Sequence, residues 1–136
     1  MNYNHPYLND DVCYERLFSE YKMYNRRLII AFNFDNTIYD IHKKGYDFSE
    51  IIDLLRECKS RGMYLICISD EHSEQLASEY LDKKEIPFDS INKNNPYFTP
   101  KSGRLYYNLL LDDRAGLLSS FHVLKKIIEN TTVGVN

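Results

Sequence analysis

The sequence predicts an α/β fold in which a parallel sheet is flanked by helices. An apolar, β-prone run from Leu28 to Phe32 ends abruptly in small polar residues, and a second run, Tyr106 to Leu111, ends in Asp112-Asp113. Continuous apolar runs of this length are typical of strands buried on both faces, which belong to parallel sheets. Stretches with helical periodicity separate the strand-like runs, and this alternation indicates right-handed βαβ units. We therefore expect a three-layer, Rossmann-like arrangement with helices on both faces of the sheet.

The length of 136 residues predicts a single domain. We divide it into an N-terminal extension with a helix (1–26), an α/β core (27–130) and a short tail (131–136). The net charge of -3 gives no electrostatic reason for tight nucleic-acid binding, although it leaves a local basic patch open. The sequence has no run of about 18 apolar residues and no signal-peptide core. With an odd number of cysteines, three, these features predict reduced thiols in a cytoplasmic protein that does not enter a membrane.

The first half of the chain predicts a helix, a strand and a second helix. The helix from Asp10 to Asn25 has apolar residues at spacings of three to four, and the strand follows at about Leu28 to Phe34. Residues 38–46 are too few for a domain and suit a short flap beside the end of that strand. Asp47 and Glu50 form a capping-box pattern before the second helix, which Gly62 ends.

The second half predicts three further strands and two helices. A strand at Tyr64–Ile68 ends at Ser69-Asp70, and a helix follows at about 73–84. A short third strand at 88–91 precedes a loop at 92–103 that is rich in Asn, Pro, Ser and Lys. The fourth strand is expected at 105–111 and the last helix at about 116–129.

Polar side chains follow three of the predicted strands, where the strands end. They are Asn33, Asp35 and Thr37, then Ser69 and Asp70, and finally Asp112 and Asp113. In open parallel sheets, ligands bind at the carboxyl ends of the strands. Two adjacent carboxylates there repel each other without a cation, so the Asp pair favours metal binding over a simple helix cap.

The order hhhh-N-x-D-x-T, hhhh-S, a basic residue and hhhh-D-D resembles the haloacid dehalogenase superfamily of phosphohydrolases. The resemblance extends from about Leu28 to Gly116 and is greatest for small members without a large cap, because the intervals between the motifs leave no room for a cap domain. It implies a Mg²⁺-dependent phosphomonoester hydrolase that acts through an aspartyl-phosphate intermediate.

The resemblance also implies the roles of individual residues. Position 33 would carry the nucleophile, and Asp35, two residues on, would be the general acid and base. Thr37 would position Asp35 or the substrate. Ser69, with Asp70 beside it, would donate a hydrogen bond to a phosphoryl oxygen.

Charge neutralisation would come from a basic residue and a metal ion. The loop before the fourth strand contains Lys93, Lys101 and Arg104, and counting back from the Asp pair favours Arg104 over Lys101 for the phosphoryl group. Asp112, with Asp113 acting through water, would hold Mg²⁺, and position 33 and the backbone carbonyl of Asp35 would complete the protein ligands.

The departure from the family pattern is at position 33, where this chain has Asn. An amide is neutral, is not a useful nucleophile and is a poorer ligand for a hard cation than a carboxylate. The chain as written is therefore expected to be inactive through the family mechanism. Three interpretations stay open: an Asp replaced in this chain, a natural non-catalytic member that binds a ligand or a partner, and Asp35 acting directly as a water-activating base.

The sequence leaves the substrate open. A site without a cap admits a phosphorylated small molecule, a nucleotide, a nucleic-acid end or a phosphoprotein, and a homo-oligomer is a further way to enclose a small phosphate. Tyr39, Tyr46, Tyr97 and Phe98 lie in segments that are expected to border the site. His72, just beyond the second strand, is open to contact with the substrate, although an inert surface histidine is the favoured interpretation.

Overall fold

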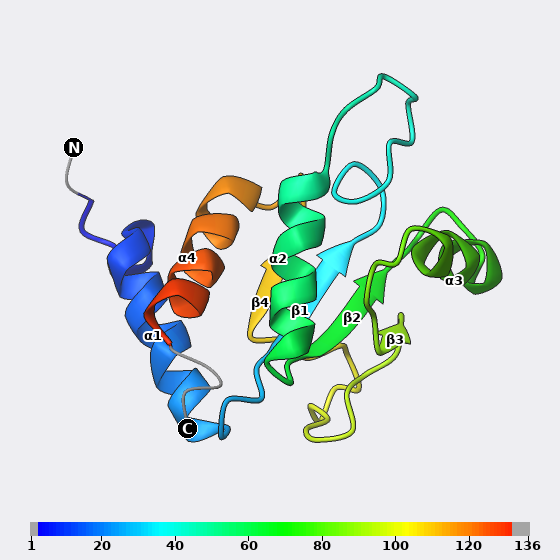
Figure 1. Ribbon diagram of the computed structural model, residues 1–136. Coiled ribbons are helices and arrows are strands. Elements are labelled where there is room, and N and C mark those ends of the chain that lie inside the picture. The colour runs from blue at the N-terminus through cyan, green and yellow to red at the C-terminus, as the bar shows by residue number, and fades with distance from the viewer. Residues whose placement is uncertain (1–2, 132–136) are drawn as a thin grey trace.

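The computed structural model describes residues 3–131 and contains four α-helices around a four-stranded sheet (Figure 1). The helices are α1 (Asp10–Met23), α2 (Ser49–Ser60), α3 (Glu74–Lys83) and α4 (Leu117–Asn130), preceded by a 3-10 turn at Pro6–Leu8. The strands are β1 (Ile29–Asn33), β2 (Tyr64–Ile68), β3 (Ser90–Ile91) and β4 (Leu109–Leu111). The predicted α/β class, with a parallel sheet flanked by helices, is confirmed.

All strand pairs are parallel, and the strand order is β3-β2-β1-β4. Ile30 of β1 pairs with Leu65 of β2 on one side and with Leu109 of β4 on the other. The chain leaves β1 toward β2 and β3, and it returns to β4 on the opposite side of β1. The order of the sheet therefore reverses between β1 and β4, which is where open α/β sheets bind their ligands.

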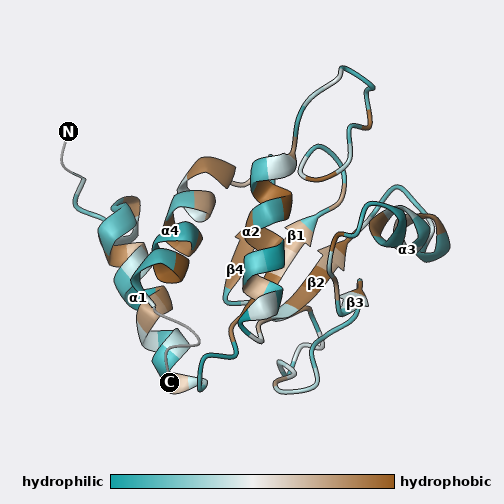
Figure 2. Ribbon diagram, viewed as in Figure 1, coloured by the Kyte–Doolittle hydropathy of each residue, from teal (hydrophilic) through white to brown (hydrophobic). Residues whose placement is uncertain are grey.

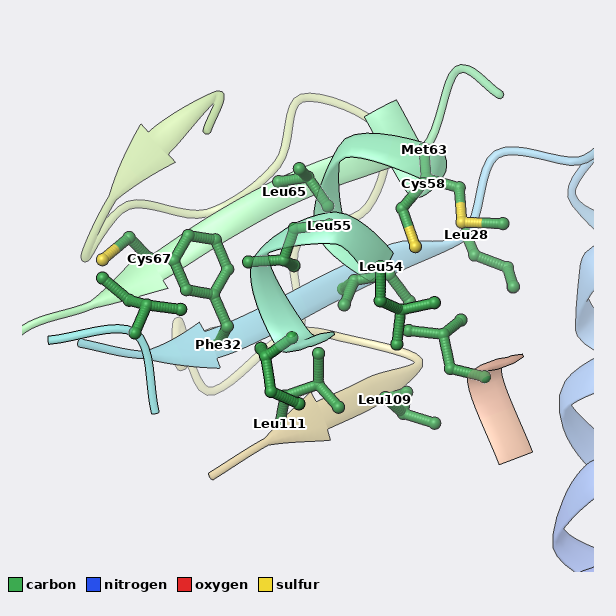
Figure 3. Close-up of a cluster of buried hydrophobic side chains, with 14 of the residues drawn as sticks. Leu28, Phe32, Leu54, Leu55, Cys58, Met63, Leu65, Cys67, Leu109 and Leu111 are labelled. Atoms are coloured by element: carbon green, nitrogen blue, oxygen red, sulfur yellow. The ribbon is translucent and has the colours of Figure 1, made fainter. Parts of the chain in front are cut away.

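One face of the sheet carries the main hydrophobic core. The side chains of each strand alternate, and all four helices contribute buried residues to the cluster on this face. Figure 2 shows strands that are hydrophobic along most of their length and helices that carry both kinds of residue. Figure 3 shows how the α2 side chains pack onto those of the strands; the labelled core residues are Leu28, Phe32, Leu54, Leu55, Cys58, Met63, Leu65, Cys67, Leu109 and Leu111.

The other face is covered by an irregular segment. The cluster there is built on Ile29, Ala31 and Ile66, and the residues that cover it come from the chain before β4, Leu105 and Tyr106. Among residues 3–131, the residues of this smaller cluster come from the strands and the segment before β4, and no helix contributes to it. The Asn, Pro and Ser residues of segment 92–108 interrupt helical periodicity, and the segment crosses the sheet without regular structure.

The two outer strands are shorter than predicted because side chains replace part of the backbone pairing. β4 begins at Leu109 and not at residue 105. Just before it, the Asn108 side chain accepts from the Ile29 N–H through Oδ1 at 2.7 Å, and the Asn108 N–H donates to the Ile29 oxygen at 2.7 Å. β3 is limited to 90–91, and Asp89 Oδ2 accepts from the Leu65 N–H at 2.8 Å. An Asn or Asp at the start of a strand thus supplies the acceptor that a further strand residue would have supplied.

The helix ends match the predicted signals at some positions and not at others. Ser73 caps α3 by accepting from the Leu76 N–H, and Gly62 follows α2 with φ +82°. The predicted capping box of Asp47 and Glu50 does not form, because Asp47 Oδ1 accepts from the Ser49 N–H at 2.9 Å in a local turn. The α1 helix packs mainly against α4, and the predicted tail lies outside the described residues except for Thr131.

Among residues 3–131, no helix is both long and apolar enough to cross a bilayer.

Candidate functional site

A tight turn after β1 brings the three polar residues of the first motif together. Phe34 is buried and donates its N–H to the Ile68 oxygen, which extends the pairing with β2 by one residue. Asn36 then adopts φ +57°, and the N–H groups of Ile38 and Tyr39 return to the Phe34 oxygen. Asn tolerates this left-handed conformation better than most residues. The chain therefore folds back at once and keeps position 33, Asp35 and Thr37 at the carboxyl end of β1.

Asn33, the last residue of β1, and Thr37 both contact the carboxylate of Asp113, which follows the neighbouring strand β4. The Asn33 amide nitrogen donates to the Asp35 carbonyl oxygen at 2.9 Å and to Asp113 Oδ1 at 3.4 Å. Thr37, with no exposed surface, donates its hydroxyl to Asp113 Oδ1 at 3.4 Å and accepts from the Asp113 N–H at 3.1 Å. The two ends of the predicted motif meet at the point where the strand order reverses.

The acidic residue at this meeting point is Asp113 and not Asp112. Asp112 Oδ1 accepts from the Arg114 N–H at 3.0 Å, so Asp112 closes the turn that leads into α4. Leu111 is fully buried in the main core, and the chain turns immediately after it. The structure therefore brings Asp113, and not Asp112, into contact with Asn33 and Thr37, and the metal role expected of Asp112 stays a prediction.

Two oxygens converge on the Asn33 amide at the end of β1. Magnesium prefers one or two carboxylates with further oxygens, and the oxygens that converge here are Asp113 Oδ1 and the Asp35 carbonyl. Both accept from the Asn33 amide, and since both are acceptors only the nitrogen side of that amide can face them. In the described part of the chain, no group of three or more His, Cys, Asp or Glu residues surrounds a point that suits a metal ion. The Asn33 amide donates hydrogen bonds where a cation would bind.

Ser69 presents a free hydroxyl beside this network. The residue is 4% exposed, and its Oγ has no hydrogen-bond partner among the described residues. Its backbone is held by Asn92, whose Oδ1 accepts from the Ser69 N–H at 2.9 Å and whose Nδ2 donates to the Ser69 oxygen at 2.8 Å. Buried hydroxyls without a partner are uncommon in folded proteins, so the Ser69 hydroxyl is an unusual feature of this strand end. Asn92 follows β3 directly and was missed at the sequence level, while Asp70 is exposed.

His72 is part of the site, contrary to its interpretation as an inert surface residue. Its Nε2 lies 2.8 Å from Asp35 Oδ1, and the two side chains are 18% and 19% exposed. Asp35 also acts on the thiol beneath it, because burial and then the Asp35 charge raise the pKa of Cys67 to about 12. A histidine four residues past the end of a neighbouring strand was the only sequence signal for this contact.

Lys101 and Arg104 do not reach the carboxyl ends of the strands. Arg104 precedes β4, and a strand parallel to β1 begins at the amino edge of the sheet, opposite the site (Figure 1). The same segment packs at that edge, where the Tyr97 ring lies 6.0 Å from the ring of Tyr64, the first residue of β2. Lys101 and Arg104 are both exposed there, so counting back from the Asp pair led to the wrong edge.

Lys93 is the basic residue of that loop that lies beside the candidate site. It follows Asn92, the residue that holds Ser69, and its Nζ is 3.9 Å from Glu74 Oε1 in the first turn of α3. Its side chain is 75% exposed.

The flap is closed on itself by Asp40. The Asp40 carboxylate accepts from the backbone N–H groups of Lys44, Gly45 and Tyr46 at distances from 2.7 to 3.3 Å. Desolvation acts to raise the pKa of this carboxyl, but these hydrogen bonds and the charge of His42 lower it on balance. At the base of the flap, the Tyr39 ring stacks on Phe34 at 4.9 Å. Of the aromatics expected at the site, Tyr39 is thus beside it, whereas Tyr97 and Phe98 line a recess at the amino edge with Tyr24 and Arg27.

Comparisons with known proteins support the fold and name no activity. No family model matches the sequence, and no curated protein matches it. A solved structure described as that of a conserved protein coded by a locus from Bacteroides thetaiotaomicron is similar, with a TM-score of 0.57 and 25% sequence identity. The similarity covers 78% of this chain and 93% of that one.

Proposed function

We propose that this fold carries a site for Mg²⁺-dependent hydrolysis of phosphomonoesters through an aspartyl-phosphate, and that Asn at position 33 makes the chain as written inactive. One observation carries the proposal. Position 33, the Asp35 carbonyl, Thr37 and Asp113 converge on one point at the end of β1, beside β4. Packing of the hydrophobic core alone does not require a buried threonine, Thr37, at the strand ends or a carboxylate, Asp113, in contact with it.

Each remaining group has a chemical part in such a reaction. A nucleophile at position 33 would attack the phosphorus, and Asp35 would give a proton to the leaving oxygen and later take one from water. The Ser69 Oγ, unpartnered among residues 3–131, would donate to a phosphoryl oxygen, and the Lys93 ammonium would reduce its charge. We assign that charge role to Lys93 rather than to Lys101 or Arg104, because Lys93 alone of the three follows the residue that holds Ser69.

The identity of position 33 decides between the catalytic and the silent form. Asn and Asp have the same shape, so an Asp at this position would replace the amide donor by a carboxylate oxygen without a packing change. Two carboxylates, at positions 33 and 113, would then face each other and the Asp35 carbonyl, which is a donor set that suits Mg²⁺.

The direct test is to measure phosphate release by the Asn33→Asp form from nucleotides, sugar phosphates, phosphorylated DNA ends and p-nitrophenyl phosphate, with and without Mg²⁺. We expect release only with Mg²⁺, and none from the chain as written or from the Asn33→Asp/Asp35→Asn double variant. A second readout is thermal stability, because Mg²⁺ should raise the Tm of Asn33→Asp and leave that of the parent unchanged. No release across the panel, together with equal Mg²⁺ responses of the two proteins, would contradict the proposal.

A second candidate function is a non-catalytic domain that binds a phosphorylated ligand or a partner. The observation in its favour is that the Asn33 amide satisfies both neighbouring oxygens, so the site is complete without a cation. A natural coding sequence with Asn at position 33, and binding of a nucleotide by the parent without turnover, would favour this function. The substrate class proposed for either function is a phosphorylated small molecule or nucleotide in a cytoplasmic protein, with a nucleic-acid end as the larger alternative and a homo-oligomer as the means of enclosing a small phosphate.

A further inference from the structure

His72 makes a contact that none of the motifs explains. Its Nε2 lies 2.8 Å from Asp35 Oδ1, and less than a fifth of either side chain is exposed. We infer that His72 is a positioning residue, which fixes the carboxylate of Asp35 so that its other oxygen faces the substrate. The inference rests on the proposed function, in which Asp35 is the acid and base.

Aromatic rings hold the imidazole in place. The His72 ring lies edge-on to Phe34 at 5.3 Å and to Tyr39 at 5.5 Å. Tyr80 of α3 closes the group, at 4.8 Å from the Tyr39 ring and 5.5 Å from that of Phe34. Edge-to-face packing of this kind is a favoured arrangement of rings and restricts their rotation. The rings come from the end of β1, the flap and α3, so three segments define the direction of Nε2.

Asp35 is consequently held at two points. Its backbone oxygen accepts from the Asn33 amide at 2.9 Å, and its Oδ1 contacts His72. In the described part of the chain, no hydrogen bond to Oδ2 is found. A proton-transferring carboxylate gains from such fixing, because small misplacements of a catalytic group cost one to two orders of magnitude in rate.

The shape of His72 suggests variants that separate its hydrogen bond from its packing. Gln has its amide nitrogen as many bonds from the backbone as Nε2 and can donate to Oδ1. Asn ends one bond short, and Phe keeps the ring but has no nitrogen. A residue that only fills space is replaced best by Phe, whereas a positioning donor is replaced best by Gln.

The test is made in the Asn33→Asp background with kcat and KM measured separately. We expect His72→Phe and His72→Asn to lower kcat about tenfold with KM changed less than about twofold, and His72→Gln to keep about half of kcat. Equal kcat in all three variants, or a loss that appears only in KM, would overturn the inference. So would retention of full kcat by His72→Phe alone.

A measurement that needs no activity separates this inference from the proposed function. In the chain as written, His72→Phe and Asp35→Ala should each lower the Tm, and the double variant should fall no further than the larger single change. Additive shifts would show that the two side chains are not coupled and would overturn the inference. If coupling is found but Asn33→Asp hydrolyses nothing, the proposed function fails and His72 is left as one half of a structural pair.

Discussion

At the scale of the residue, two hydrogen-bonding groups characterise the candidate site, the Asn33 amide and the Ser69 hydroxyl. The Asn33 amide has two acceptors where a cation is expected, and the Ser69 hydroxyl is buried with no partner among the described residues. Both hydrogens of the Asn33 amide thus have an acceptor, whereas the Ser69 hydroxyl has no partner in the described part of the chain. Both facts are consistent with a phosphate site in which an amide nitrogen at position 33 replaces a carboxylate oxygen.

Removal of the Ser69 hydroxyl should separate binding from stability. A buried hydroxyl without a partner costs free energy on folding, so Ser69→Ala should leave the free energy of unfolding unchanged or raise it by up to about 1–3 kcal/mol. The same change should weaken binding of inorganic phosphate about tenfold, because a hydrogen bond to a charged group is lost. Calorimetric titration and urea unfolding measure the two quantities. The matched control is Ser73→Ala, which removes the α3 cap and should lower stability by about 1 kcal/mol without changing phosphate affinity; the reverse pattern would contradict our assignment.

At the scale of the element, the path of segment 92–108 determines which basic residue belongs to the site. The segment leaves the carboxyl end of β3 and enters β4 at the amino edge, so its first residues lie near the site and its last residues lie opposite. Any residue just before a strand of a parallel sheet lies at the amino edge, opposite the carboxyl ends of the strands. Counting residues back from the Asp pair does not take into account that the segment crosses from one edge of the sheet to the other.

Lys93 and Lys101 therefore make a matched pair of variants. Lys93→Ala should weaken binding of inorganic phosphate about threefold, because an exposed ammonium contributes modestly to a bound anion. Lys101→Ala removes the same charge from the opposite edge and should leave the affinity unchanged. The effect of Lys93 should shrink at high salt. Equal losses for the two variants would indicate a general charge effect and not a site.

The flap offers a second test at this scale. Asp40→Ala removes the acceptor of three backbone N–H groups and should speed hydrogen exchange of Lys44, Gly45 and Tyr46 about tenfold. Because the pKa of Asp40 is lowered, its contribution is present above the unfolded value of 3.8 and is lost as the pH falls through the lower folded value. Asp47→Ala, which affects a different turn, is the control. Unchanged exchange in Asp40→Ala would show that the flap is held by other contacts.

At the scale of the whole molecule, stability should fall in alkaline solution. Burial raises the pKa of Cys58 and of Cys67 from 9.0 to about 12, and burial together with neighbouring groups raises that of Tyr106 from 10.0 to about 12. A group whose pKa is raised on folding stabilises the protein fully below its unfolded pKa and loses that effect as the pH rises toward the folded value. Urea unfolding at about pH 8 and about pH 10.5 should show a clear loss, and Cys58→Ala should reduce the slope. A flat profile across this range would contradict the burial of both thiols.

Local patterns predicted the fold and the polar residues at the strand ends, and tertiary contacts decided which of those residues meet. The strands, the turn with Asp35 and Thr37 and the Ser69 position follow from short-range signals, since each depends on a few neighbouring residues. The choice of Asp113 over Asp112 depends on where β4 stops, and the choice of Lys93 over Arg104 depends on how a loop crosses the sheet. The contact of His72 with Asp35 depends on side-chain directions that no single element fixes.

The most direct test of the central claim is to detect a phosphoryl group on position 33. The Asn33→Asp form would be mixed with labelled acetyl phosphate and Mg²⁺, quenched in acid and digested with pepsin at low pH, because an acyl phosphate hydrolyses at alkaline pH. We predict that the label is found on the peptide that contains position 33 and that it is lost in hydroxylamine, as an acyl phosphate requires. Phosphate release without label on that peptide would contradict the account.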